Sequence, residues 1–279
     1  MSSQDLSGDS LQKKNLTALQ NLLNIMEKLR DPISGCAWDR EQTLASILPH
    51  ALEEAYEVAE AIAVGEPLAI RDELGDLLFQ VVFLSRIAEE QNWFSFDDVA
   101  EAIVSKLVRR HPHVFATTKA LSSLEQTQAW EKFKAREREV AGQGGVLAGI
   151  ALALPALTRA TKLGKRAAQV GFDWPDSAGV RAKINEELAE FEAAVADSES
   201  AQRQIEEFGD VLFSFVNWAR HLKIDPEAAL RVANVKFEKR FAHMERIALA
   251  RGIALESIGL PAWETLWLEA KAAHHGCLD

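Results

Sequence analysis

The amino-acid sequence predicts an all-α protein made of two similar helical halves. Long segments rich in Ala, Leu, Glu, Lys and Arg place apolar residues three and four positions apart, which is the period of an amphipathic helix. Segments that alternate apolar and polar residues, as half-buried strands do, are nearly missing. In addition, one ordered set of short motifs occurs twice, at a separation of about 130 residues.

Turn-forming residues divide the helical segments from one another. Gly65, Pro67 and the Asp225-Pro226 pair stand between apolar runs, and aspartate before proline is a typical helix start. The predicted helices span residues 44–63, 71–91, 97–110, 121–141, 180–196, 200–222 and 226–250.

The repeated motifs indicate a duplicated domain. Glu-Glu-x-x-Glu occurs at residues 53–57 and 186–190, and Glu-x-Gly-Asp-x-Leu-Phe occurs at 73–79 and 207–213. Only two copies exist, so the chain is not a solenoid. Glycines at 142–145 break the composition between them. We therefore predict tandem helical domains of helix-hairpin or four-helix-bundle architecture, at residues 16–141 and 166–275, with a linker and connecting helix at 142–165.

The overall charge and the cysteines narrow the class of protein. The chain has 31 basic and 42 acidic side chains, a net charge of -11, which disfavours nucleic acid or an anionic membrane as partner. Cys36 and Cys277 lie far apart, so neither a disulfide framework nor a zinc site is expected. The first 15 residues are polar, and the longest nearly uncharged stretch is shorter than the roughly 20 residues that span a bilayer. We expect a cytoplasmic protein.

Each half carries two pairs of carboxylates at helical spacing. Residues three apart lie on one helix face, and a short turn between two helices lets them fold back antiparallel. Four carboxylates of each half are then expected to converge. They are Glu54, Glu57, Glu73 and Asp76 in the first half, and Glu187, Glu190, Glu207 and Asp210 in the second.

The surroundings of the aspartates favour a metal site over a solvated acidic face. Asp76 and Asp210 sit within apolar runs, and an unpaired buried carboxylate costs several kcal/mol. A divalent cation would balance such a cluster. All-oxygen ligands favour Mg²⁺, Mn²⁺ or Ca²⁺ over zinc. A helical di-iron site is disfavoured because neither segment carries the Glu-x-x-His pair that it needs.

Basic and aromatic residues accompany both acidic clusters. Cations four apart share a helix face and suit a polyphosphate, although a solvated basic stripe has the same pattern. A tryptophan four residues before a lysine could stack on a base, or could pack in a core or dimer interface. The candidates are Lys106, Arg110, Trp130 and Lys134 in the first half, and Lys236, Arg240, Trp267 and Lys271 in the second.

The two halves differ at one polar position. Asn217 follows Asp210 by seven residues, lies on nearly the same helix face, and could bond a base or sugar. Its first-half counterpart is Phe83, which cannot. We therefore expect the second half to carry the catalytic site.

Taken together, these motifs resemble those of the MazG family of nucleoside triphosphate pyrophosphohydrolases. The first-half signatures lie at residues 35–39, 53–57, 73–78 and 109–115, and those of the second at 170–174, 207–213 and 234–241. The resemblance implies an all-α pyrophosphohydrolase fold, Mg²⁺, a homodimer, and hydrolysis between the α and β phosphates.

The resemblance also implies roles for individual residues. Glu187, Glu190, Glu207 and Asp210 would be metal ligands. Lys236, Arg240 and Lys271 would hold phosphates, and Trp267 would contact the nucleotide.

The function predicted is hydrolysis of ribo- or deoxynucleoside triphosphates to a monophosphate and pyrophosphate. It would depend on Mg²⁺, with Mn²⁺ as a possible substitute, and Glu186 or Glu187 would orient the attacking water. A non-catalytic helical module that senses nucleotides or binds a protein remains the alternative.

Overall fold

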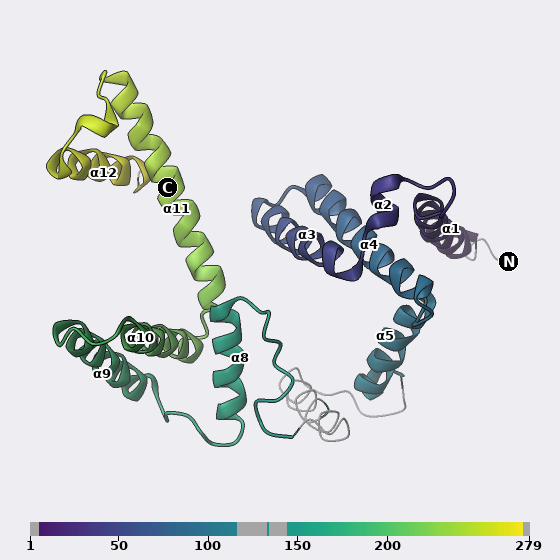
Figure 1. The fold of residues 1–279 in the computed structure, drawn as a ribbon, viewed down its shortest axis with the longest axis horizontal. Helices are drawn as coiled ribbons and strands as arrows, with labels where there is room; N and C mark the ends of the chain where they lie inside the picture. The colour runs from purple at the N-terminus through teal and green to yellow at the C-terminus, as the bar shows by residue number, and fades with distance from the viewer. Residues whose placement is uncertain (1–5, 116–132, 134–143, 276–279) are drawn as a thin grey trace. The chain divides into compact units, whose positions relative to one another are not determined.

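The computed structural model describes residues 6–115, 133 and 144–275 of the chain. Within these ranges every regular element is a helix, which confirms the all-α fold class (Figure 1). The chain divides into two compact units, Met1–Glu131 and Lys132–Asp279, and each is described by itself. None of the described helices is long and apolar enough to cross a membrane.

A helix hairpin is the centre of the first unit. Helix α3 (Leu44–Val64) packs along α4 (Pro67–Glu90). A capping box at Thr43 starts α3, and Gly65 ends it with a φ of 84°, a left-handed conformation that glycine adopts at little cost. Proline in the first turn of α4 then favours the new helix. The unit also contains α1 (Leu6–Leu29), α2 (Ala37–Glu41), α5 (Phe96–Arg110) and α6 (Pro112–Phe115).

The core of the first unit lies between α1, α3 and α4. Met26, Ile47, Val82, Phe83 and Ile87 are each at most 2% exposed and pack together. Burial of such side chains contributes about 1.5–3 kcal/mol each, so this cluster fixes how α4 lies on its neighbours.

A buried arginine fastens the loop that leads into α3. Arg30 donates hydrogen bonds from Nε and Nη2 to the Glu90 carboxylate, at 3.0 and 2.6 Å. Its Nη1 donates to the carbonyl oxygens of Asp39 and Gln42, and the guanidinium lies 5.4 Å from the centre of the Phe83 ring. One side chain therefore joins α4 to α2, through Asp39, and to Gln42, which lies between α2 and α3.

The second unit repeats the hairpin with α9 (Ser177–Ala196) and α10 (Ala201–His221). Asp176 and Ser200 cap the two helices, because their side-chain oxygens accept hydrogen bonds from backbone N–H groups of the first turn. The other elements are α8 (Ala156–Ala168), α11 (Pro226–Ala250), η1 (Leu255–Ser257) and α12 (Leu260–His275). Helix α8 packs against α10 and α11, and a small core of Met244, Ala248, Leu266 and Ala270 joins α11 to α12.

Six of the predicted helices are confirmed as α3, α4, α5, α9, α10 and α11. The seventh, at 121–141, lies outside the described residues apart from residue 133, which is helical. The prediction missed the long helices α1 and α12 and the short elements α2, α6 and η1. Since α8 begins inside the predicted linker and packs within the second unit, the boundaries 16–141, 142–165 and 166–275 stay a prediction.

Candidate functional site

Three carboxylates of the second unit meet between α9 and α10. Glu187 of α9 and Glu207 and Asp210 of α10 each place one oxygen within 4.8 Å of the others. Glu187 and Glu207 are buried, at 6% and 3% exposure, whereas Asp210 is exposed. Glu190 lies one turn further along α9, is exposed, and is outside this group.

Two cations balance the buried carboxylates. Lys183 Nζ lies 2.7 Å from both Glu186 and Glu187, and Arg203 pairs with Glu207. Hydrogen bonds to Glu186 and Glu187 raise the pKa of Lys183, so that it stays charged. These pairs lower the cost of burying two carboxylates. In the described part of the chain no ion pair forms with Asp210.

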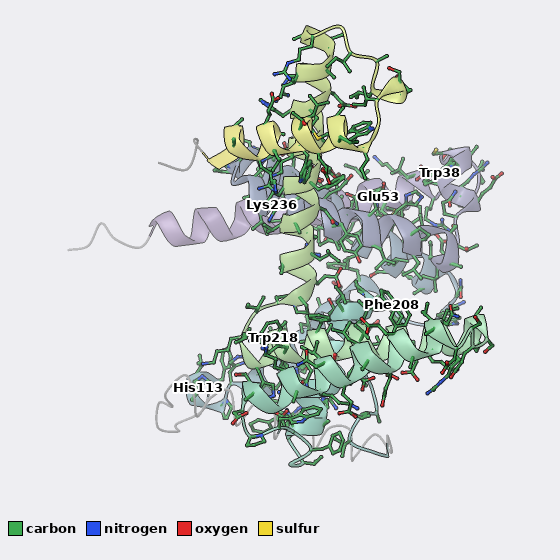
Figure 2. All side chains as sticks on the ribbon, turned by 90° about the vertical axis from the view of Figure 1, so that its left-hand side faces the viewer. Trp38, Glu53, His113, Phe208, Trp218 and Lys236 are labelled. Atoms are coloured by element: carbon green, nitrogen blue, oxygen red, sulfur yellow. The ribbon has the colours of Figure 1, made fainter. Side chains whose placement is uncertain are left out.

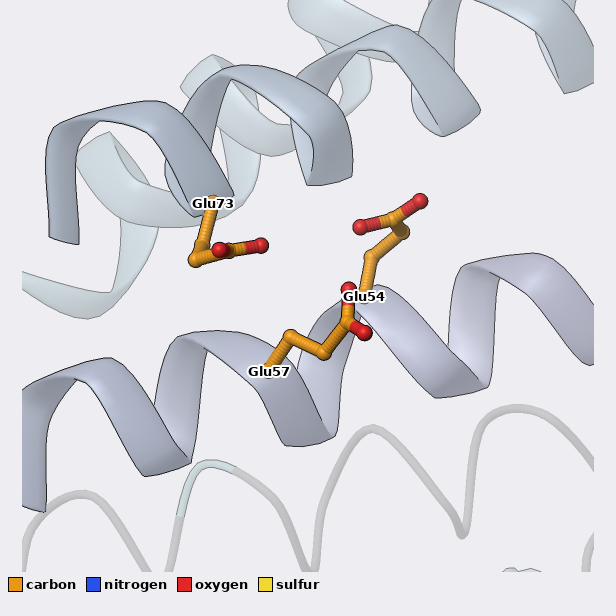
Figure 3. A group of neighbouring side chains, drawn as sticks. All are labelled: Glu54, Glu57 and Glu73. Carbon is orange, nitrogen blue, oxygen red and sulfur yellow. The ribbon is translucent and has the colours of Figure 1, made fainter. Parts of the chain in front are cut away.

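The first unit contains a similar cluster without those cations. Glu54 and Glu57 of α3 and Glu73 of α4 lie within 4.8 Å of one another (Figure 3). The positions that correspond to Lys183 and Arg203 are His50 and Ala69.

Within the described residues no lysine or arginine pairs with the first cluster, and the pKa of Glu57 is raised accordingly. Loss of hydration, a hydrogen bond to Glu54 and the negative charges of Glu54, Glu73 and Glu53 together raise the pKa of Glu57. Gln80 donates to Glu54 at 3.3 Å, and Asp76 is exposed and outside the group. The two clusters thus share their acidic ligand types but differ in electrostatic balance.

The inference that the aspartates are buried was wrong. Asp76 and Asp210 are both exposed. Their apolar neighbours Leu78 and Leu212 are themselves 41% and 44% exposed, because the apolar runs continue onto the open face of each hairpin. Helix periodicity identifies an apolar face but does not say what covers it. The carboxylates that are actually buried are Glu187 and Glu207.

A small cavity adjoins the second cluster. Its lining includes Trp174, Lys183, Glu187, Asp210 and Asn217, so it brings the predicted Asn217 beside two of the carboxylates. The Trp174 indole packs on α9 at Gly179, where an added Cβ would come within 2.6 Å of the ring. The glycine therefore lets the indole form one wall of the cavity.

The predicted basic and aromatic residues of the second half gather in a separate group. The Arg240 guanidinium lies 5.7 Å from the centre of the Trp267 ring, and the Phe237 ring is 5.5 Å from Trp267. These residues join α11 to α12, which also carry Lys236 and Lys271. Lys236 lies on the part of α11 that leads away from α10, the helix of Phe208 and Trp218 (Figure 2).

The first-half counterparts are only partly described. Lys106 and Arg110 lie one turn apart on α5, with Arg110 half-buried. Trp130 and Lys134 lie outside the described residues.

Three residues of the second site were not among the sequence candidates. Lys183 and Arg203 each precede a buried glutamate by four residues, a spacing typical of helical ion pairs, so this signal was present. Trp174 lines the cavity from a loop, where no periodicity predicts the orientation of a side chain.

Comparison with known proteins covers both units. The family model for the MazG nucleotide pyrophosphohydrolase domain matches residues 42–115. The nucleoside triphosphate pyrophosphohydrolase of Escherichia coli K12 is 48% identical over 258 residues, which cover 92% of this chain and 98% of that protein. The nucleoside triphosphate pyrophosphohydrolase/pyrophosphatase MazG of Thermotoga maritima is 43% identical over 252 residues, 90% and 95% of the two chains. Similarity of this extent, over about nine-tenths of the chain, shows that the chain belongs to the MazG family.

Proposed function

We propose that the chain hydrolyses nucleoside triphosphates to a nucleoside monophosphate and pyrophosphate, at the site between α9 and α10. The observation that carries this proposal is the juxtaposition of Glu187, Glu207 and Asp210 with a cavity lined by Trp174 and Asn217. Its relatives of nearly equal length are named for this activity. Phe83 at the position of Asn217 is buried in the core of the first unit, so we assign catalysis to the second unit.

The donor set fits a hard divalent cation. Three carboxylates offer only oxygen, two of them are buried, and Asp210 is accessible from solvent. Glu187, Glu207 and Asp210 would hold Mg²⁺, or Mn²⁺ in its place, with Glu190 reaching in from the next turn of α9. When bound, the metal polarises the α-phosphate and lowers the pKa of water.

The remaining steps fall to the side chains of the protein. Glu186 or Glu187 would orient the attacking water and take its proton. Attack on the α-phosphorus breaks its bond to the bridging oxygen, and pyrophosphate leaves. Lys236, Arg240 and Lys271 would offset the charge of pyrophosphate. This role requires the group on α11 and α12, from this chain or from a second copy, to reach the triphosphate.

The same proposal includes a homodimer. Phe208, Leu212 and Phe215 form a stripe along α10 and are 42–48% exposed. Leu74, Leu78 and Val81 form the corresponding stripe along α4 and are 37–50% exposed. Continuous exposed apolar faces of this kind favour association between copies. Light scattering at micromolar concentration is expected to give twice the chain mass of 30.9 kDa, and a mass of one chain would remove the homodimer from the proposal.

The decisive experiment follows the products. The full-length protein is incubated with MgCl₂ and a mixture of nucleoside triphosphates, and the products are separated by anion exchange. We expect monophosphate and pyrophosphate in equal amounts, and none after addition of excess EDTA. Diphosphate with orthophosphate would contradict the assigned bond, whereas nucleotide binding without any product would favour the sensing module.

A further inference from the structure

We propose that Arg220, held by Asp173, is a positioning residue that turns the Asn217 carboxamide so that its N–H groups donate to the bound nucleotide. The ligand feature recognised is a hydrogen-bond acceptor on the nucleoside, either a base atom or a sugar oxygen. The inference rests on the proposed function, since it concerns the cavity beside the same carboxylates.

A single guanidinium joins the three residues. Arg220 Nε donates to Asn217 Oδ1 at 2.7 Å, while Nη1 and Nη2 donate to the two Asp173 carboxylate oxygens at 2.9 and 2.5 Å. His221 Nε2 lies 2.9 Å from the same carboxylate. The hydrogen bonds from Arg220, with His221 in support, lower the pKa of Asp173 to about 2. Asp173 is therefore a permanent anion that fixes Arg220.

The chemistry of the guanidinium decides which way the amide faces. Arginine only donates, so the Asn217 atom that meets it must be the carbonyl oxygen. The amide nitrogen then points away from Arg220. Asn217 is 6% exposed and lines the cavity. Among the residues that the structure describes, none accepts a hydrogen bond from Asn217 Nδ2, and this atom keeps access to solvent, so its N–H groups are available to a ligand in the cavity. An acceptor on such a ligand would satisfy them.

The surrounding packing leaves this network little freedom. An added Cβ at Gly164 of α8 would lie 3.2 Å from Arg220 Nε and 3.4 Å from Asn217 Oδ1, so the glycine lets α8 close over the hydrogen bond. Asp173 is also the neighbour of Trp174. The guanidinium therefore fixes both the amide and the loop that carries the indole wall.

Among its described residues, the first unit has no equivalent of this arrangement. By the repeat, Arg86 corresponds to Arg220, but it pairs with Glu89 and Glu90 on its own helix, at 3.1 Å each. Phe83 occupies the place of Asn217 within the core. The network thus accompanies the cavity of the second unit and does not belong to the hairpin fold in general.

The test compares full-length R220K, N217L and the double variant. Lysine keeps the charge but cannot donate to Asn217 and to both Asp173 oxygens in one plane. We expect each single variant to raise KM for the nucleoside triphosphate about tenfold, the usual effect of one lost hydrogen bond, with kcat within about threefold. The double variant should match N217L, because Arg220 acts through Asn217. R86K is the matched control, with KM unchanged.

Two further readouts separate recognition from structure. Inorganic tripolyphosphate, which has no nucleoside, should inhibit the wild type and R220K equally. Two sets of substrates identify the nucleoside atom that accepts from Asn217: deoxynucleoside triphosphates, which lack the 2′-hydroxyl, and nucleoside triphosphates whose base lacks acceptors. The wild type should discriminate against the set that lacks this atom, and N217L should lose that discrimination only.

Other results would overturn the inference. One is an unchanged KM in R220K, and another is additive effects on KM in the double variant. A third is inhibition by tripolyphosphate that is weakened in R220K by the same factor as the KM for the nucleoside triphosphate. If the wild type releases no pyrophosphate, the proposed function fails by itself, and calorimetric nucleotide binding to wild type and R220K still decides the role of Arg220.

Discussion

Asn in place of Asp210 is expected to lower kcat for pyrophosphate release by about 10²–10³-fold with no change in thermal unfolding. Asp210 is one of three carboxylates within 4.8 Å, so its charge contributes directly to cation binding. It is also exposed and has no ion pair in the described part of the chain, so the fold does not depend on it. Steady-state kinetics and differential scanning calorimetry on the full-length protein measure the two effects.

Asp76→Asn is the matched control for this prediction. Asp76 occupies the same place in the first hairpin and is likewise exposed. If catalysis belongs to the second unit, this control keeps wild-type kcat. Equal losses in the two variants would mean that both clusters are catalytic, and loss only in the control would place catalysis in the first unit.

Replacement of Arg30 by Met is expected to destabilise the first unit by about 2 kcal/mol, because it removes the buried donor to the carbonyl oxygens of Asp39 and Gln42 and leaves Glu90, which is partly exposed, with Arg86 alone. The Arg30 side chain is 6% exposed, and it satisfies the Glu90 carboxylate and two backbone carbonyls. Hydrogen exchange read by mass spectrometry on the intact chain separates the two units, and the loss of protection should be confined to α1–α5.

Arg71→Met supplies the comparison for Arg30. Arg71 pairs with Asp72 at 2.6 Å, but the side chains are 70% and 60% exposed, and such surface pairs contribute about 0–1 kcal/mol. A loss in Arg30→Met no greater than in Arg71→Met would contradict the role given to Arg30.

The stability of Arg30→Met should also differ from that of the wild type in its dependence on pH. Hydrogen bonds and charge from Arg30, with help from Arg86, lower the pKa of Glu90 in the folded protein. A carboxyl with a lowered pKa stabilises the fold above its unfolded pKa, and this contribution is lost as the pH falls through the folded value. In Arg30→Met, the free energy of unfolding of the first unit should therefore fall less steeply than in the wild type as the pH is lowered into the acid range.

Both hairpins and the convergence of the glutamates follow from local signals in the sequence. Apolar residues at helical spacing predict the helices, and Gly65 and Ser200 mark where they end and begin. Carboxylates three residues apart on facing helices then come close once the connecting turn is short, although the structure gathers three of the predicted four in each half and leaves Asp76 and Glu190 outside. Duplication strengthens the prediction, because the same spacing occurs in both halves.

Tertiary contacts between distant residues could not be predicted in this way. Arg220 and Asp173 are separated by 47 positions, and Arg30 and Glu90 by 60. In both units an arginine holds the segment before the first carboxylate helix, Arg30 in the first unit and Arg220 in the second. The two arginines do not occupy corresponding positions in the repeat, so a comparison of the two halves of the sequence does not reveal their similar role. Which apolar faces stay open is likewise a property of the folded unit, and this is why the burial predicted for Asp210 was wrong.

The proposed chemistry requires a divalent cation among Glu187, Glu207 and Asp210. A crystal structure of the full-length protein with Mn²⁺ and a non-hydrolysable nucleoside triphosphate analogue, with anomalous data at the manganese edge, tests it most directly. We expect an anomalous peak bonded to oxygens of all three carboxylates, next to the α-phosphate of the analogue. Saturating Mn²⁺ without a peak there, with Glu187 and Glu207 still bound only by Lys183 and Arg203, would contradict it.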